Sequence, residues 1–258
     1  MSGRMAGGTP EGLGAILGEG PARRLILPSL EAIPGLLHAF TVRGSDTAAV
    51  LSASAGAALP LSTLRQVHGA GVQTIGEDGR APAGAPPAAT GETPEGDALL
   101  TRRSGLALGV YVADCAPILI CDPQTRGIAA VHAGWRGTVA GVLPEAIGAL
   151  CDAFGARAGD LRLGIGPCIG PCCFEVGDEV VEALLDADPG ATTCIVDGAR
   201  RRIDLVEANR RQAVACGVDP DLIETAGLCT MCRGDLLESY RRGRGRAGRM
   251  AALIAWKP

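Results

Sequence analysis

The sequence predicts a single α/β domain of the α+β kind, in which mixed β-sheets are flanked by helices. Three observations support this fold class. Short apolar runs bounded by turn residues alternate with segments of helical apolar spacing. Some runs follow one another as hairpins do, whereas others are separated by a helix, which is typical of a mixed sheet. Of the 258 residues, 47% are hydrophobic, which is enough to build a large core.

The chain divides into a tail and one domain. Residues 1–20 are glycine-rich and lack apolar periodicity, so we expect a flexible N-terminal tail there. Residues 21–258 are expected to form the single domain. The stretch from Gly76 to Gly96 is dense in Pro, Ala, Gly and Thr, and we expect a surface loop within that domain.

Strands are expected wherever short apolar runs end at turn residues, over 105–113, 118–121, 127–132, 161–165, 222–226 and 250–256. Helices are expected where apolar residues recur every three or four positions, over 144–154, 178–187 and 204–216. Pro144 is accepted in the first turn of the first helix. Asp178 and Asp204 are the expected N-caps of the other two, and Gly217 ends the last one.

Composition limits the classes of function. The net charge of −4 argues against a sequence-independent nucleic-acid binder, which needs a basic surface. Residues 1–20 lack a basic segment followed by an apolar one, and no stretch approaches the roughly 20 apolar residues that span a bilayer. We therefore expect a cytoplasmic protein that binds neither nucleic acid nor membrane.

The ten cysteines are expected to be free thiols, because a chain of this size without a signal sequence belongs in a reducing compartment. Most should be small buried hydrophobic residues. Cys172, Cys173, Cys229 and Cys232 are also interpreted as ordinary thiols, with a second zinc or redox site as the alternative. Five arginines between 241 and 249 indicate either a solvated loop or an anion site.

One hairpin brings two candidate ligands together. A six-residue turn of sequence DPQTRG joins two apolar runs. If Cys121 pairs with Ile128, then Pro117 lies opposite His132. Cys115 then becomes the diagonal neighbour of His132 on the same face, with about 7–8 Å between the backbones. The register therefore predicts a thiol and an imidazole at one edge of a sheet.

A third ligand is needed for a metal site. His68 ends a short apolar stretch and precedes a glycine, and besides it only His38 offers another imidazole. One thiolate and two imidazoles fill three of the four positions around zinc and leave one open, as in catalytic sites. The alternative is a buried cysteine and two hydrogen-bonded histidines with no metal.

Seven segments, RQVHG, GDALLT, ADCAPILICD, VHAGWRGT, GPCIGPCCFEVG, CT and SYRR, resemble the YfiH family, in the family's order from Arg65 to Arg242. The family is variously described as multicopper polyphenol oxidase (laccase), peptidoglycan editing factor and purine nucleoside phosphorylase. The resemblance implies that His68, Cys115 and His132 hold a zinc ion. It also implies the family's single domain, a YfiH-like cysteine hydrolase fold.

The resemblance has two departures. Where the family often has Arg followed by Gly-Gly-Val-Ser, this chain has Arg43 followed by Gly-Ser-Asp, which leaves the role of Arg43 open. Phe174 stands where the family usually has Tyr, so the aromatic ring is kept without its hydroxyl group.

The activity implied by the resemblance is zinc-dependent phosphorolysis of adenosine, inosine, guanosine or methylthioadenosine, with adenosine deamination. The partners are then purine nucleosides and phosphate. Arg43, Arg65 and Arg136 are the candidate phosphate-binding residues, with ordinary surface ion pairs as the alternative. Asp114 and Glu175 are candidate catalytic carboxylates that shuttle protons, or else carboxylates that orient a histidine.

Other functions remain as alternatives. A multicopper oxidase centre needs about ten histidines, whereas this chain has three, so we expect copper only as an alternative metal. A thiol hydrolase would use Cys115 as a nucleophile activated by His132. The resemblance also allows a hydrolase that edits peptidoglycan precursors. Whether the protein is a monomer or a dimer stays open.

Overall fold

The computed structural model describes residues 14–76 and 93–258, and the expected loop between Gly76 and Gly96 lies mostly outside them. In these residues the strands form two six-stranded sheets and a two-stranded ribbon. The first sheet has the order β1-β2-β3-β14-β7-β4. Its strands are, in that order, Ala15–Leu17, Arg24–Ile26, Leu36–Thr41, Met250–Trp256, Ala107–Val112 and Leu61–Ser62.

The second sheet has the order β13-β10-β8-β9-β6-β5 and carries the candidate site at one end. Its strands are, in that order, Ile223–Thr225, Arg162–Ile165, Ala116–Cys121, Ile128–Ala133, Ala98–Thr101 and Val72–Thr74. Both sheets are mixed, since β4 runs parallel to β7, β13 to β10 and β5 to β6, while the other pairs are antiparallel. The ribbon pairs β11 (Ile195–Val196) with β12 (Arg202–Ile203).

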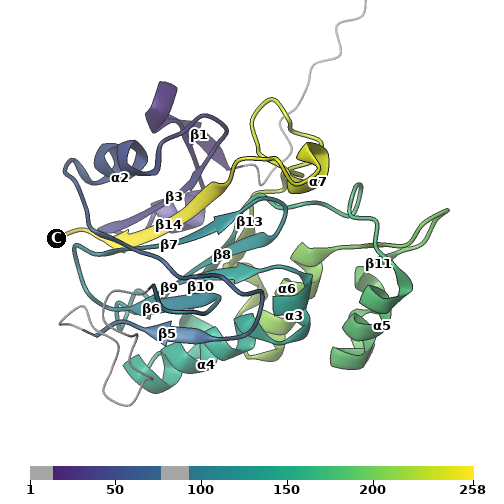
Figure 1. The fold of residues 1–258 in the computed structure, drawn as a ribbon. Coiled ribbons are helices and arrows are strands. Elements are labelled where there is room, and N and C mark those ends of the chain that lie inside the picture. The colour runs from purple at the N-terminus through teal and green to yellow at the C-terminus, as the bar shows by residue number, and fades with distance from the viewer. Residues whose placement is uncertain (1–13, 77–92) are drawn as a thin grey trace, which may run out of the picture.

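The described residues also form α-helices around the two sheets. They are α1 (Pro28–Glu31), α2 (Thr47–Ala55), α3 (Trp135–Val139), α4 (Val142–Phe154), α5 (Asp178–Ala187), α6 (Leu205–Ala215) and α7 (Tyr240–Gly243). The described residues also contain short 3-10 helices at Gly20–Ala22 (η1), Ala158–Asp160 (η2), Pro189–Cys194 (η3) and Pro220–Leu222 (η4). Figure 1 shows α2 beside the first sheet and α4 beneath the second, with α5 and β11 to one side.

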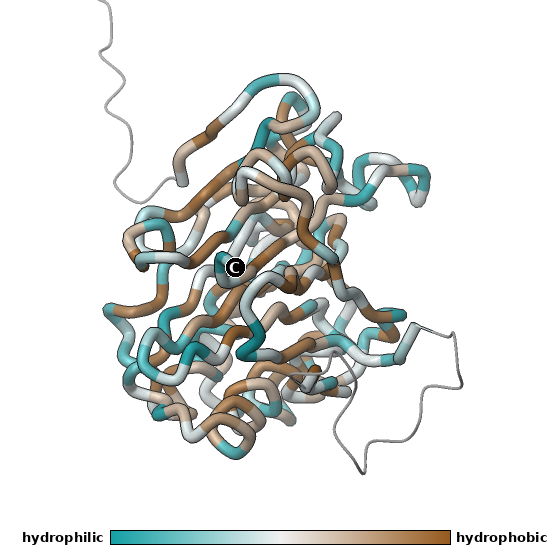
Figure 2. Tube along the Cα trace, turned by 90° about the vertical axis from the view of Figure 1, so that its left-hand side faces the viewer, coloured by the Kyte–Doolittle hydropathy of each residue, from teal (hydrophilic) through white to brown (hydrophobic). Residues whose placement is uncertain are grey.

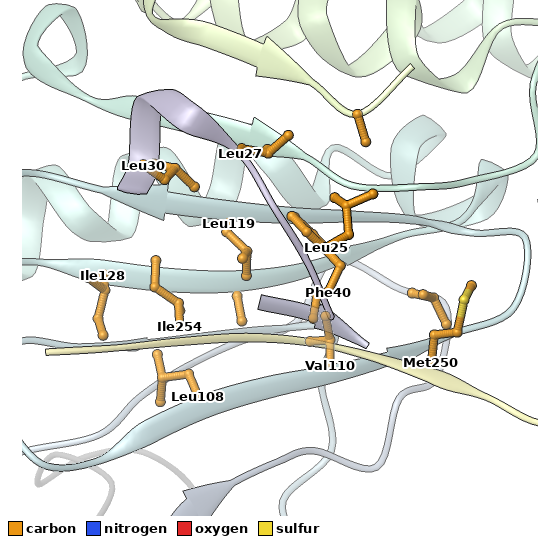
Figure 3. Packing of buried hydrophobic residues seen from close by; sticks show 14 of the residues in the cluster. Leu25, Leu27, Leu30, Phe40, Leu108, Val110, Leu119, Ile128, Met250 and Ile254 are labelled. Atoms are coloured by element: carbon orange, nitrogen blue, oxygen red, sulfur yellow. The ribbon is translucent and has the colours of Figure 1, made fainter. Parts of the chain in front are cut away.

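The main core lies between the two sheets. Leu25, Phe40, Leu108 and Ile254 of the first sheet pack with Leu119 of the second, as Figure 3 shows. A second cluster lies between the other face of the second sheet and α4, and a third between the first sheet and α2. The layers are therefore helix, sheet, sheet, helix. In Figure 2 the hydrophobic stretches follow the inner strands, and hydrophilic ones gather at the peripheral turns.

The central strand β8 shows why its sequence is apolar without alternation. Leu119 and Cys121 contribute to the core between the sheets, whereas Ile118 and Ile120 contribute to the core under α4. All four side chains are fully buried. A strand covered on both faces reads as a continuous apolar run.

The mixed-sheet α+β fold predicted from the sequence is confirmed. The expected bounds of α5 and β14 agree with the structure, and the other predicted elements differ by one or two residues at their ends. Asp204 caps α6 by accepting hydrogen bonds from two backbone N–H groups, as predicted. The N-cap of α5 is instead Gly177, because Asp178 already lies in the first turn.

Some elements were not expected. Residues 15–17, assigned to the tail, form β1 because their backbone groups pair with β2. Residues 1–13 lie outside the described part of the chain. The first turn of α4 begins two residues before Pro144. Among the described helices, none is long and apolar enough to traverse a lipid bilayer.

Candidate metal centre

The β8–β9 hairpin has the register predicted from its turn. Cys121 pairs with Ile128, and Pro117 lies opposite His132. Asp122, which begins the turn, accepts hydrogen bonds from Gln124 N (2.9 Å) and Thr125 Oγ1 (2.6 Å) and so fixes the loop. Cys115 precedes β8 directly, and His132 is the last but one residue of β9.

His68 reaches the same end of the sheet from the segment between β4 and β5. Its backbone lies in the left-handed region, with φ of 60°, which is uncommon for a residue with a side chain. The carboxylate of Asp97 stabilises this turn by accepting hydrogen bonds from His68 N (2.9 Å) and Gly69 N (2.7 Å). A strained residue held in this way is typical of a functional site.

Asp97 also orients His132. Its Oδ1 lies 2.8 Å from His132 Nδ1, and its backbone oxygen accepts a hydrogen bond from His132 N. The Asp97 side chain is completely buried. Because Nδ1 of His132 is engaged, Nε2 is the ring nitrogen available to a ligand, as in metal-bound histidines that carry a carboxylate partner. Sequence reasoning missed Asp97, although an aspartate just before the apolar run ALLT was a visible signal.

The three predicted ligands converge. The ligand atoms of His68, Cys115 and His132 lie within 4.8 Å of one another. The two imidazole rings meet edge to face, with 4.8 Å between their centres. A Cβ atom on Gly134 would lie 2.8 Å from Cys115 Sγ and 3.2 Å from His68 Nδ1. Only glycine at position 134 therefore leaves room for the thiol and the imidazole to face each other.

The electrostatics of the centre favour a thiolate. Burial raises the pKa of Cys115, but hydrogen bonds from His132 and His68 outweigh it and lower the pKa to about 7. Burial likewise opposes the charged form of His132, yet Asp97 and Cys115 raise its pKa to about 9. Asp97 has a lowered pKa despite its burial, because His132 and backbone N–H groups donate hydrogen bonds to it.

This donor set fits zinc. One thiolate and two imidazoles provide three soft or borderline ligands, and a tetrahedral ion keeps its fourth position for water or substrate. His132 is buried, Cys115 is half-buried and His68 is exposed, so the centre opens to solvent on the side of His68. The third imidazole, His38, lies in β3 of the other sheet. There its Nε2 accepts a hydrogen bond from Leu27 N (2.8 Å), so it takes no part.

The two candidate carboxylates are both engaged. Asp114 precedes Cys115 and also has a positive φ, of 84°. Its two oxygens accept hydrogen bonds from Thr230 Oγ1 (2.5 Å) and Arg241 N (2.7 Å), which joins the turn before β8 to the C-terminal segment. Glu175 pairs with Arg200 at 3.1 Å on the surface.

The three candidate phosphate-binding arginines differ in their partners. Arg43 forms a two-point ion pair with Glu238, at 3.0 and 3.2 Å. Arg65 pairs with Glu95. Arg136, in the helix that follows β9, stacks on the ring of Trp135 at 4.3 Å and forms no ion pair within the described residues. Of the three candidates, Arg136 is therefore the one that no carboxylate among the described residues neutralises.

Two of the five C-terminal arginines hold the backbone of neighbouring segments. Arg242 donates hydrogen bonds to the backbone oxygens of Thr230, Met231 and Leu237. Arg241 donates to the backbone oxygen of Glu175. A concavity of about 710 Å³ lies on another part of the surface, lined by residues of α6 and the turn between α3 and α4. None of the three ligands lines it, and we place the site at the ligands because the reactive groups converge there.

The sequence model of a family described as multi-copper polyphenol oxidoreductase laccase matches residues 44–257. The chain belongs to this family, the YfiH family. The match covers most of the domain, including the three predicted ligands, and bears out the resemblance seen in the sequence motifs.

Relatives within the YfiH family carry several names. Purine nucleoside phosphorylase YlmD of Geobacillus stearothermophilus is 37% identical over 192 residues, 73% of this chain and 69% of that protein. Purine nucleoside phosphorylase of Bacteroides thetaiotaomicron is 40% identical over 161 residues, 61% of this chain and 60% of that protein. Adenosine deaminase RL5, from an unknown prokaryotic organism, is 40% identical over 149 residues, 57% of this chain and 56% of that protein.

Solved structures of YfiH-family proteins share the fold. The crystal structure of YlmD from Geobacillus stearothermophilus superposes with a TM-score of 0.84 at 26% identity, covering 96% of this chain and all of that one. YfiH of Bacillus licheniformis gives a TM-score of 0.79 at 25% identity, over 94% of this chain and 99% of that one. The chain is therefore like these structures over nearly its whole length.

Proposed function

We propose that this protein is a zinc-dependent purine nucleoside phosphorylase that also deaminates adenosine. The observation that carries the proposal is the convergence of His68, Cys115 and His132 at one open site. The names of its YfiH-family relatives, purine nucleoside phosphorylase and adenosine deaminase, supply the substrate class. The substrates are then adenosine, inosine, guanosine or methylthioadenosine, together with phosphate.

Zinc is the proposed ion. When bound at such a site it acts as a Lewis acid and lowers the pKa of water, which suits attack on a purine ring. Copper binds the same ligands more tightly and is the alternative metal. A multicopper oxidase centre is disfavoured, because the chain has three histidines and His38 lies in the other sheet.

The chain's own residues have distinct proposed roles. Asp97 positions His132 by accepting a hydrogen bond from its Nδ1. Arg136 binds the phosphate anion, since it lies four residues after His132 and pairs with no carboxylate in the described residues. Arg43 and Arg65 can also bind phosphate only if they break their ion pairs with Glu238 and Glu95.

Phosphorolysis requires a group that delivers a proton to the departing base. In phosphorolysis a phosphate oxygen forms a bond to the ribose C1′. The bond from C1′ to the purine nitrogen breaks, and the base leaves with the bonding electrons and takes up a proton. Asp114 and Glu175 are the proposed proton shuttles. Asp114 is also held in place by Thr230 and Arg241, so it positions the neighbouring Cys115 as well.

We place the enzyme in the cytoplasm, where its ten free cysteines stay reduced.

The test is to incubate metal-analysed protein with adenosine, with and without phosphate, and to follow adenine, inosine and hypoxanthine by chromatography. We expect adenine only with phosphate present, and inosine also without it. Cys115→Ser should lose both activities with the zinc, whereas Cys216→Ser, a thiol on another part of the surface, should keep them. Inertness of the zinc-loaded protein toward every nucleoside would overturn the proposal.

A second candidate is a thiol hydrolase, including one that edits peptidoglycan precursors. The lowered pKa of Cys115 beside His132 favours it, because a thiolate is the attacking form. Alkylation would then abolish activity and chelators would not, whereas the zinc enzyme should lose activity when the metal is removed. Polyphenol oxidation by copper-loaded protein is tested in parallel with a phenolic dye substrate.

A further inference from the structure

Four cysteines outside the centre form a second cluster. The sulfur atoms of Cys172, Cys173, Cys229 and Cys232 lie within 4.8 Å of one another. Cys232 Sγ is 3.6 Å from Cys172 Sγ and 3.4 Å from Cys173 Sγ. Cys172 and Cys232 are exposed and the other two are half-buried, so the cluster lies near the surface.

Two turns supply these thiols, and the backbone holds the turns together. Cys172 and Cys173 lie in the turn between β10 and α5, and the other pair lies in the turn after β13. Cys168 and Cys229 form a parallel bridge, and Thr230 N donates a hydrogen bond to Cys168 O (2.9 Å). The two pairs of thiols are therefore brought together by main-chain contacts that do not involve sulfur.

The sulfur distances fit one metal ion. In a tetrahedral site with metal–sulfur bonds of about 2.3 Å, neighbouring sulfurs are about 3.8 Å apart. A disulfide needs about 2.05 Å. The distances of 3.4 and 3.6 Å around Cys232 are close to the edge of such a tetrahedron and well beyond a disulfide bond.

One backbone N–H group, one glycine and one arginine lie beside the cluster. Gly170 N donates a hydrogen bond to Cys229 Sγ (3.3 Å). A Cβ atom at position 170 would lie 3.3 Å from Cys229 Cβ and 3.4 Å from Cys172 Sγ, so glycine keeps this space open. Arg202 donates to the backbone oxygen of Cys172 (3.3 Å), which places a positive charge beside the cluster.

We propose that Cys172, Cys173, Cys229 and Cys232 bind a second Zn²⁺ ion in a closed, four-thiolate structural site. Each thiol releases its proton to solvent as its sulfur–zinc bond forms, and no atom is oxidised or reduced. With four protein ligands the ion has no open position, so this site performs no catalysis. The proposal does not rest on the nucleoside activity.

The site has a structural consequence for the first centre. Thr230 lies between two of the four cysteines, and its hydroxyl donates to Asp114, the residue before Cys115. Arg242 donates to the oxygens of Thr230 and Met231 within the same turn. An ion that fixes this turn therefore also fixes the segment that carries the first centre's thiol.

The experiment measures metal per chain in protein purified under reducing conditions with zinc supplied. Wild type should hold two zinc ions. A variant without the first centre, His68→Ala/Cys115→Ser/His132→Ala, should hold one, and its X-ray absorption spectrum should show four sulfur neighbours. Cys229→Ser/Cys232→Ser should retain only the ion of the first centre, and the matched control Cys216→Ser should retain both.

Three results would overturn the proposal. The first is a triple variant that folds and holds no zinc. The second is nitrogen or oxygen in its metal shell, or iron in place of zinc. The third is a disulfide among the four cysteines in the reduced protein, shown by mass spectrometry. If Cys229→Ser/Cys232→Ser fails to fold, the triple variant alone decides, because its four cysteines are intact.

Discussion

At the scale of single residues, Asp97 holds two of the three predicted ligands of the first centre in place. It contacts the main chain of His68 and Gly69 and the ring of His132. Its role could not be predicted from the sequence, because its partners are 28 to 35 positions away along the chain. His68 lies 47 positions before Cys115 along the chain, so resemblance and not local pattern assigns it to the site.

Replacing Asp97 with Asn should lower zinc affinity about 10- to 100-fold while the protein still folds, because His132 loses its anionic partner. Competition with a chromophoric chelator measures this. Asp122→Asn is the matched control, since Asp122 is equally buried but only fixes the hairpin turn. Unchanged zinc affinity in Asp97→Asn, or an equal loss in the control, would contradict the role given to Asp97.

Gly134→Ala should abolish zinc binding with little change in the stability of the fold. Its φ of −73° is accessible to alanine, so the backbone tolerates the change. The new methyl group would instead press on Cys115 Sγ, 2.8 Å away. Gly148→Ala, in α4 with open space around it, is the control and should stabilise the helix by about 0.5–1 kcal/mol. Zinc content and thermal unfolding distinguish the two variants.

At the scale of elements, the β8–β9 hairpin was predictable in register because a short turn with fixed ends leaves one pairing. That register places Cys115 near His132 by local pattern alone. Other elements could not be predicted from the sequence, because they lack a recognisable apolar pattern. The helix α3 has five residues, too few for periodicity, and β3 contains a histidine inside its apolar run. Their positions depend on packing against distant segments.

Strand β8 should be intolerant of truncation on both faces. Leu119 and Ile120 point to different cores and are both fully buried. We expect Leu119→Ala and Ile120→Ala each to cost about 2–5 kcal/mol in the free energy of unfolding, measured with denaturant. A loss below about 1 kcal/mol for either one would show that one face of the strand is not tightly packed.

At the scale of the whole molecule, stability should depend on pH through His38. Burial, and secondarily the charge of Arg24, lowers its pKa from 6.5 to about 4. Glu31 lies 3.8 Å from its Nδ1 but is half exposed, so water weakens that attraction. Between these pKa values the unfolded chain binds a proton that the folded chain does not, so the free energy of unfolding falls as pH falls.

Over the window from pH 6.5 to 4 this loss should amount to roughly 3 kcal/mol. His38→Gln keeps an acceptor for Leu27 N and has no proton to bind, so its stability should fall less over the same window. Denaturant unfolding at several pH values gives the comparison, and other titrating groups cancel in the difference. Parallel curves for the two proteins would contradict this account.

The contacts of Asp97 also determine how the first centre comes into being. One buried carboxylate accepts a hydrogen bond from the backbone of His68 and also orients the ring of His132. If that turn opens, Asp97 becomes exposed to water, and His132 loses the hydrogen bond that orients its ring. The centre therefore assembles or dissolves in a single event, and zinc uptake should follow one transition, without a half-formed site.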